Sequence, residues 1–248
     1  MQAAAAGSAY RGGQGIEPEL LAEIRKHYGF DQPPLTRFIT MVSRYARFDF
    51  GQSFFRDVPV TQLVWQKLPV SLSLGLWTTV IVYLVSIPLG IRKARRDGSA
   101  FDAWTSLVIA VGQAVPAFLF AVMLLILFAG GSYVQWFPLR GLTSPQWAEL
   151  STLGKIADYF WHLVLPVTAM VVGGFASLTL LTKNSFLEEL SKQYVMTARA
   201  KGLSDRRVLY GHVFRNAMLV VIAGLPSAVM AILFTSALLI EVIFSLDG

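Results

Sequence analysis

The sequence predicts an all-α protein whose helices cross a membrane several times. Three observations support this: 54% of the 248 residues are hydrophobic, only 15% are charged, and the mean hydropathy is +0.55. Soluble domains carry about 25% charged residues, so this chain has too few polar side chains to cover a globule in water. The net charge of +6 suits Lys and Arg placed in loops on one side of a membrane, and we expect no nucleic-acid partner.

The residue types also exclude several kinds of chemistry. The chain has no Cys and only three His, which are widely separated in the sequence. Disulfides, thiolate metal ligands and a Cys nucleophile are therefore ruled out, and no familiar zinc motif is present. We expect no catalytic residues, no metal and no cofactor in this chain.

Four stretches lack Asp, Glu, Lys and Arg and exceed the roughly 20 residues that a membrane helix needs: 68–91, 103–139, 159–182 and 216–240. The second stretch ends in a Gly-rich and aromatic segment that is typical of an exit loop. We therefore expect spans at about 68–91, 104–129, 163–182 and 216–240. Several spans carry an internal proline, which a membrane helix tolerates where neighbouring helices satisfy the freed carbonyl group; these are Pro88, Pro116, Pro166 and Pro226.

The basic residues between the spans predict the orientation. Segment 92–98 holds four bases and one acid, and segment 183–215 holds seven bases and three acids, whereas 130–163 holds two of each. Because cytoplasmic loops are enriched in Lys and Arg, we expect 92–98 and 183–215 in the cytoplasm and 1–67 outside, in the periplasm.

Residues 1–67 carry eight bases and six acids and no signal peptide. Export of such a region needs a preceding membrane helix, and the chain stops in a turn directly after its last span. We therefore expect an intact protein with one further helix at each end, six spans in all, in which 68–248 belongs to the transmembrane domain. Within the external region we expect amphipathic helices at 18–28 and 35–48, the second packed on the protein rather than on lipid.

The most informative segment is the cytoplasmic stretch 188–217, which is long enough for two helices and a turn. Ala-rich residues favour a first helix, Lys201-Gly202 ends it, and Ser204 is placed to cap a second helix. Small side chains at Ala198 and Ala200 would allow close docking of a partner. The bases here either pair with acids of that partner or simply reflect orientation in the membrane.

This stretch resembles the signature loop of the inner-membrane permeases of binding-protein-dependent ABC importers. The dipeptide/oligopeptide branch of that family usually has Y-V-x-T-A-R-A-K-G-L, and residues 194–203 read YVMTARAKGL. The chain departs from the family's more general pattern at the positions Met196, Thr197, His212, Phe214 and Arg215. Further similarities to the B-type permease subunit run in order along the chain, including FDFGQS at 48–53, IPLG at 87–90 and EVIFS at 241–245. In detail the sequence looks most similar to the oligopeptide and microcin C uptake permease.

The resemblance implies a multi-pass permease of the bacterial inner membrane with the type I ABC importer fold. Its implied partners are a homologous second permease, two ATP-binding subunits, a periplasmic peptide-binding protein and membrane lipid. ATP and magnesium would be bound by the ATPase, since the chain lacks the phosphate-binding G-x-x-x-x-G-K-[ST] motif. The implied ATPase-docking residues are Tyr194, Thr197, Ala198, Arg199, Ala200, Lys201, Gly202, Ser204 and Arg207.

Three questions stay open from the sequence. Glu241 and Phe244, at the external end of the last span, either line a pore gate or stabilise the following turn. An ion-coupled transporter or channel is the alternative to an ATP-driven importer, although it requires ionisable groups inside the spans, which are free of Asp, Glu, Lys and Arg. An intramembrane enzyme would need a nucleophile with a base, or a metal pair, at a spacing that the sequence does not show.

Overall fold

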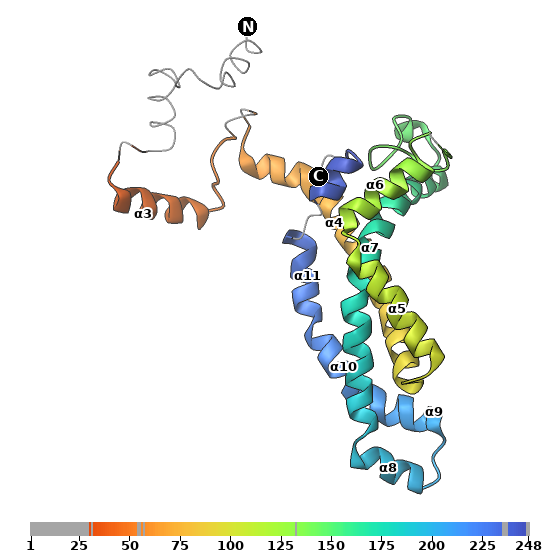
Figure 1. Cartoon of the computed structure of the whole chain (residues 1–248). Coiled ribbons are helices and arrows are strands. Elements are labelled where there is room, and N and C mark those ends of the chain that lie inside the picture. Colours follow the sequence, from red (N-terminus) through yellow and green to blue (C-terminus); the bar gives the residue numbers. More distant parts are fainter. Residues whose placement is uncertain are drawn as a thin grey trace. The chain divides into compact units, whose positions relative to one another are not determined.

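The computed structural model describes residues 30, 32–53, 56, 58–131, 133–234 and 238–246, and every regular element longer than a single bridge in these residues is helical (Figure 1). The predicted all-α fold class is thereby confirmed. The chain divides into two compact units, Met1–Trp65 and Gln66–Gly248. The elements are α3 (Pro34–Tyr45), α4 (Val60–Arg95), α5 (Ala100–Ala114), α6 (Ala117–Phe128), the 3₁₀ turn η1 (Trp147–Glu149), α7 (Thr152–Leu190), α8 (Gln193–Ala200), α9 (Asp205–Val208), the π-helical turn η2 (Leu209–Val213), α10 (Phe214–Ala223), α11 (Leu225–Phe234) and α12 (Leu238–Ile243).

The first unit contains α3 and a tight turn. The helix expected at 35–48 is α3, while the one expected at 18–28 lies outside the described residues. Arg44, in the last turn of α3, forms an ion pair with Asp49. Its Nε and Nη2 atoms donate to the two carboxylate oxygens at 2.8 and 3.2 Å. Asp49 also accepts a bond from the backbone N–H of Gly51, whose φ of +78° suits glycine. The FDFGQS motif therefore forms a turn that an ion pair closes.

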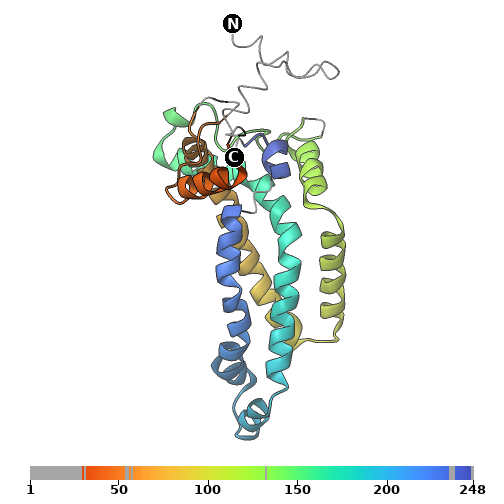
Figure 2. The same ribbon diagram turned by 90° about the vertical axis from the view of Figure 1, so that its left-hand side faces the viewer.

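Two helices of the second unit are longer than a bilayer core is thick. The 36-residue α4 and the 39-residue α7 extend about 54 and 58 Å at 1.5 Å per residue, against a hydrocarbon thickness of roughly 30 Å. Figure 2 shows α4, α7 and the α10–α11 run extending in roughly the same direction. In the part of the chain that the structure describes, three continuous helical runs are long and apolar enough to span a membrane, or four if the bent pair α5 and α6 is one span. The chain is thus a multi-pass membrane protein.

The expected helix at 104–129 is instead two helices that meet at an angle of 90°. α5 ends at Ala114, Val115 adopts an extended backbone with ψ 118°, and Pro116 precedes the first turn of α6. Proline disfavours the helical conformation of the residue before it and cannot donate a backbone hydrogen bond. The sequence predicted a tolerated kink at this proline, and the structure has a complete break.

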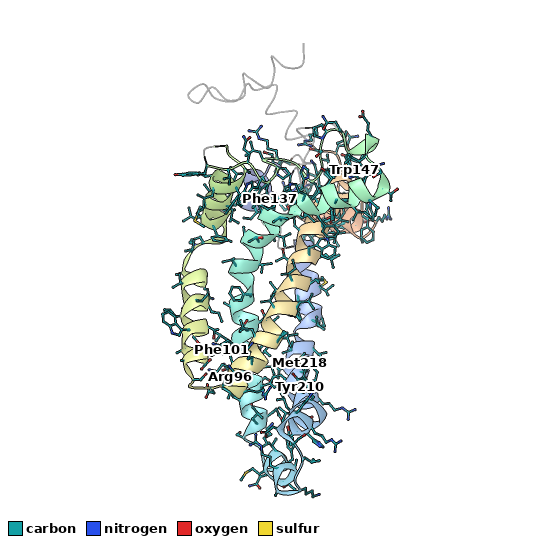
Figure 3. The ribbon with its side chains drawn as sticks, turned by 90° about the vertical axis from the view of Figure 1, so that its right-hand side faces the viewer. Arg96, Phe101, Phe137, Trp147, Tyr210 and Met218 are labelled. Atoms are coloured by element: carbon teal, nitrogen blue, oxygen red, sulfur yellow. The ribbon has the colours of Figure 1, made fainter. Side chains whose placement is uncertain are left out.

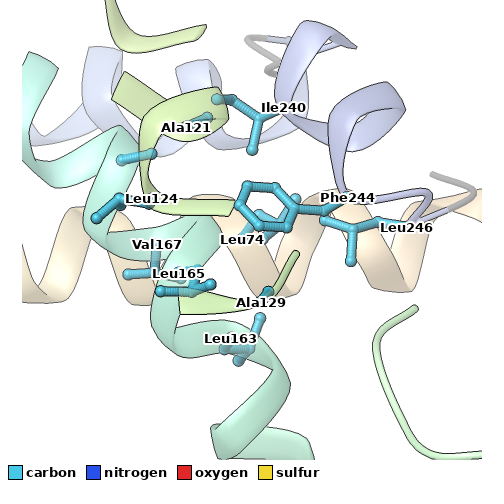
Figure 4. Close-up of a cluster of buried hydrophobic side chains, with 11 residues drawn as sticks. Leu74, Ala121, Leu124, Ala129, Leu163, Leu165, Val167, Ile240, Phe244 and Leu246 are labelled. Atoms are coloured by element: carbon cyan, nitrogen blue, oxygen red, sulfur yellow. The ribbon is translucent and has the colours of Figure 1, made fainter. Parts of the chain in front are cut away.

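Buried apolar side chains gather at the two ends of the second unit. One group, the α12-end cluster, joins α4, α6, α7 and α12 (Figure 4); it contains Leu74, Ala121, Leu124, Ala129, Leu163, Leu165, Val167, Ala169, Ile240, Phe244 and Leu246. The other, the α8-end cluster, joins α4, α7, α8, α9, η2 and α10; it contains Ile91, Ala94, Phe186, Val195, Ala198, Val208, Leu209, Val213 and Ala217. α7 contributes to both clusters, so it ties the two ends together.

α4 and α7 lie in close contact at Gly90. A Cβ atom on Gly90 would lie 2.6 Å from the Cβ of Thr182 and 2.8 Å from the carbonyl oxygen of Thr179, both of which are fully buried. One turn away, the hydroxyl of Ser86 donates to the carbonyl of Phe175 at 3.0 Å. Small residues that permit close backbone approach are the usual basis of helix packing in membranes.

Replacing Gly90 with Leu should force α4 and α7 apart. Overpacking a tight contact costs about 1–3 kcal/mol, so we expect a lower thermal unfolding midpoint for the full-length protein in detergent. Gly112→Ala is the matched control, because its added Cβ would lie at an ordinary 3.6 Å from Val172. Equal midpoints for the two variants would contradict the close contact.

Candidate functional site

The segment Ser191–Val213 forms a compact helix, turn and helix at the end of the second unit. α8 ends at Ala200, Lys201 is its C-cap, and Gly202 follows with φ +78°. The N–H of Gly202 donates to Arg199 at 2.9 Å and the N–H of Leu203 donates to Ala198 at 3.3 Å, the pair of bonds that defines a Schellman C-cap. Ser204 occupies the N-cap position of α9, as expected, but its side chain makes no capping bond. Gly202 therefore supplies the backbone conformation that reverses the chain.

The inner face of this segment packs on the rest of the protein. Val195 and Val213 are fully buried, and Ala198 is 8% exposed, all within the α8-end cluster. Close docking of a partner on the Ala198 methyl group, which the sequence suggested, does not fit this placement. Ala198 instead lets α8 sit tightly against its own chain.

The outer face is exposed and rich in small or basic side chains. Of the residues implicated from sequence, seven are exposed: Thr197, Arg199, Ala200, Lys201, Gly202, Ser204 and Arg207. Met196 beside them is 63% exposed. Arg199 and Asp205 form an exposed ion pair at 3.4 Å across the turn. A protein partner would therefore contact a positively charged surface with few bulky side chains.

Tyr194 anchors α8 rather than facing outward. Its hydroxyl donates to Glu189 Oε2 at 2.6 Å, and Lys192 pairs with the other oxygen of this 9% exposed carboxylate. Nearby, the hydroxyl of Ser185 on α7 donates to the carbonyl of Ala217 on α10 at 2.7 Å. Burial raises the pKa of Tyr194, and the bond to Glu189 raises it further, so the phenol stays protonated and remains a donor at neutral pH. The end of α7 thereby holds both α8 and α10.

A buried ion network lies at the same end of the helices. Lys93 of α4 has no exposed surface, and its ammonium group lies 2.9 Å from Asp102 Oδ1 of α5. It also donates to the carbonyl of Asp102 and to the hydroxyls of Thr105 and Ser106. Lys183 of α7 bonds the other oxygen of Asp102 at 2.7 Å. Three helices are thus joined through the carboxylate of Asp102, and Lys183 lies eight residues before Ser191, where the helix, turn and helix segment begins.

The two residues suggested for a pore gate lie in packed surroundings. Phe244 is 2% exposed and belongs to the α12-end cluster (Figure 4). Glu241 is 7% exposed and accepts a hydrogen bond from Ser71 at 3.0 Å. The carbonyl of Phe244 accepts from the N–H of Gly141 at 3.1 Å. These contacts join α12 and the residue that follows it to α4 and to the loop between α6 and α7, and a gating role stays a prediction.

The sequence did not indicate the network around Lys93 or the anchor at Glu189. Both sites contain residues that contributed only to the count of loop charges. Pairs of residues that are far apart in the chain leave no periodic pattern in the sequence. The π-helical turn η2 was also missed, although three departures from the family's general pattern, at His212, Phe214 and Arg215, fall in or directly after it. Among the described residues no group of His, Asp or Glu is arranged to hold a metal ion.

Replacing Tyr194 with Phe should loosen α8. The variant loses a hydrogen bond to a charged acceptor, which is typically worth about 1.5–3 kcal/mol, and we expect faster hydrogen exchange at residues 193–203 of the full-length protein. Tyr210→Phe is the control, because the hydroxyl of Tyr210 bonds to no described residue and that side chain is 54% exposed. Similar exchange in both variants would show that the phenol does not anchor the helix.

Replacing Gly202 with Ala should strain the turn without a clash. No atom lies within 4 Å of the added Cβ, so the cost is the left-handed backbone alone, about 1 kcal/mol. Gly202→Asn should cost less because asparagine tolerates this conformation. Unfolding of the full-length protein in denaturant should rank the variants Gly, Asn, Ala in falling stability, and an Ala variant as stable as the parent would refute the turn geometry.

Comparison with known proteins identifies the family. The family described as "binding-protein-dependent transport system inner membrane component" matches residues 86–248. The chain is 62% identical over 242 residues to the peptidoglycan transport system permease protein YejB of Agrobacterium fabrum, covering 98% of this chain and 66% of the relative. It is 59% identical over 241 residues to the inner membrane ABC transporter permease protein YejB of Escherichia coli, covering 97% and 66%.

A more distant relative is the oligopeptide transport system permease protein AppB of Bacillus subtilis, which is 34% identical over 196 residues, covering 79% of this chain and 60% of the relative. The chain thus spans about two thirds of the length of the curated relatives that it matches. The resemblance to peptide permeases and the inner-membrane location are confirmed. The chain belongs to the family of binding-protein-dependent transport system inner membrane components.

Proposed function

We propose that the chain is part of a permease subunit of an ATP-driven, binding-protein-dependent peptide importer, and that segment 191–208 docks the ATPase. The observation that carries this proposal is the division of the segment into two faces. Its inner face packs on α4, α7 and α10, and its outer face presents exposed small and basic side chains. A surface of this kind can receive a force from a partner and pass it to the membrane helices.

The charges of the outer face suit an acidic groove on the partner. Lys201, Arg206 and Arg207 are exposed and form no ion pair within the described residues, whereas Arg199 is already engaged with Asp205. Complementary charge at an interface guides association and sets the register of docking. We therefore assign direct contact to the exposed set Thr197, Arg199, Ala200, Lys201, Gly202, Ser204 and Arg207, and a positioning role to Tyr194 and Ala198.

The proposal includes the partners that such a subunit needs. These are a homologous second permease, two ATP-binding subunits that hold ATP and magnesium, and a periplasmic peptide-binding protein. Under this proposal the permease carries out no covalent chemistry, residues 1–67 lie on the periplasmic side and segment 183–215 lies in the cytoplasm. Peptides are the proposed cargo class, supported by the names of the oligopeptide and peptidoglycan permeases among the relatives. ATP-driven closure of the ATPase pair would rock the helices between inward and outward access.

An ion-coupled transporter is the weaker proposal. Ion coupling needs ionisable side chains deep in the membrane, partnered and facing a cavity. In this chain the charged side chains that are buried, such as Lys93, Asp102 and Glu241, lie at the ends of the charge-free stretches rather than within them.

Reversing two exposed charges tests docking directly. In the full-length protein expressed with its second permease and ATPase, Lys201→Glu with Arg207→Glu should lower co-purification of the ATPase by about tenfold or more, because like charges would meet at the interface. Peptide-dependent uptake should fall in parallel. Thermal stability should change little, because both side chains are exposed. Substitution of Ala198 is unsuitable, since its side chain is buried and a loss of packing would mimic a loss of docking.

The matched control is Arg140→Glu with Lys155→Glu, which reverses one base in the loop between α6 and α7 and one in the first turn of α7. This pair should leave ATPase co-purification unchanged. Normal co-purification and uptake with the Lys201 and Arg207 reversals would refute docking through this face and favour the ion-coupled alternative.

A further inference from the structure

A cavity of about 690 Å³ opens beside the docking segment, between the end of α4 and the η2 turn. One side is formed by Arg92 and Arg95 of α4 and by Arg96 directly after it, and the opposite side by Tyr210 and Phe214. Figure 3 shows Arg96, Phe101 and Tyr210 at the same end of the helices. The function proposed above uses neither this cavity nor its arginines.

The three guanidinium groups form no ion pair within the described residues. The acids nearest in sequence, Asp97 and Asp102, are already bound by Lys183 and Lys93. Arg92 and Arg96 lie over the ring of Phe101, at 4.9 and 5.8 Å from its centroid, and this stacking holds both side chains beside the cavity. The cavity therefore carries three positive charges without an anion to balance them.

Apolar side chains complete the lining. Ile87 and Ile91 come from α4, and Phe214 faces them from α10. The rings of Tyr210 and Phe214 lie 6.1 Å apart, so η2 and α10 present one aromatic wall with a hydroxyl group at its exposed edge. A small free anion such as phosphate would leave this apolar part of the cavity empty.

The cavity lies at the boundary between the apolar and the charged part of α4. The charge-free stretch 68–91 ends immediately before Arg92, and Leu84 and Val85, one turn before the lining residue Pro88, are 69% and 45% exposed. The surface of α4 that leads to the cavity is thus suited to acyl chains. Basic cavities between membrane helices at such boundaries bind anionic lipid headgroups.

We propose that this cavity binds the headgroup of an anionic phospholipid. The phosphate lies among Arg92, Arg95 and Arg96, the hydroxyl of Tyr210 donates to a phosphate oxygen, and the glycerol and first acyl carbons lie against the apolar wall. The lipid bridges α4 and the η2 turn that follows α9. Membrane composition thereby bears directly on the segment that carries the proposed docking face.

The test uses the full-length protein in detergent, with phosphatidylglycerol and phosphatidylcholine of the same acyl chains as probes. Native mass spectrometry should show preferential retention of phosphatidylglycerol, and Arg92→Gln with Arg95→Gln and Arg96→Gln should weaken that retention by about tenfold or more, because each base near the surface contributes to anionic lipid binding. Retention of phosphatidylcholine should not change. The three arginines are exposed, so the variant should fold, and its unfolding midpoint in phosphatidylcholine should match the parent.

The matched control removes three exposed bases at the same end of the protein that do not line the cavity, Arg206, Arg207 and Arg215, each changed to Gln. It should alter phosphatidylglycerol retention by threefold at most.

Equal loss of phosphatidylglycerol retention in the two triple variants would mean a general attraction of the lipid to positive charge, and would overturn the proposed site. Stabilisation by inorganic phosphate equal to that by phosphatidylglycerol would mean an anion site without a lipid requirement. If the Arg92, Arg95 and Arg96 variant retains lipid normally but loses ATPase co-purification, an acidic segment of the partner fills the cavity. This result and the phosphate result would each overturn the proposal.

Discussion

The buried ammonium group of Lys93 is the constraint on which the α8 end of the molecule depends. Removing a charge from water costs several kcal/mol unless strong partners replace the solvent, and Lys93 is fully buried. Its partners are the carboxylate and carbonyl oxygens of Asp102 and the hydroxyls of Thr105 and Ser106, so α5 must begin at the position where these groups converge. The second oxygen of Asp102 is bound by Lys183, which fixes α7 to the same point. The relative positions of α4, α5 and α7 follow from the need to satisfy one cation.

The long helix α7 connects the ion network around Asp102 to the buried clusters at both ends of the second unit. Leu163 and Leu165 belong to the α12-end cluster, Phe186 belongs to the α8-end cluster, and a single helix connects them. The tight contact at Gly90 prevents α4 from sliding along α7 without a clash at Thr182. A displacement of α8 is therefore passed to packed helices rather than absorbed by a flexible loop. This is the mechanical property that a docking segment in a transport protein requires.

Much of this arrangement could be predicted from the sequence, and the reasons for the exceptions are physical. The absence of charge over about 20 residues predicts membrane helices because the bilayer makes charge costly, and Gly202 predicted the end of α8 because a left-handed residue follows many helices. Whether Pro116 would kink or break a helix depends on its neighbours, which sequence does not specify. The same limit applies to Ala198: a small side chain suits contact with a partner and with its own chain equally well, and only the packing at Val195 and Val213 shows which face is inward.

The basic residues show most clearly what composition conceals. In the sequence, the basic residues of 92–98 and 183–215 together predict the orientation in the membrane, and each base contributes equally to that prediction. In the structure they divide into groups with different surroundings. Lys93 and Lys183 share the carboxylate of Asp102, Arg199 pairs with Asp205, and Arg92, Arg95 and Arg96 surround a cavity without a counterion. Since Asp97 and Asp102 together balance Lys93 and Lys183, the unbalanced charge of this end lies at the cavity and on the outer face of the proposed docking segment. Under the two proposals, negatively charged partners therefore bind at these two surfaces: an anionic lipid in the cavity at the membrane boundary, and the ATPase on the outer face of 191–208.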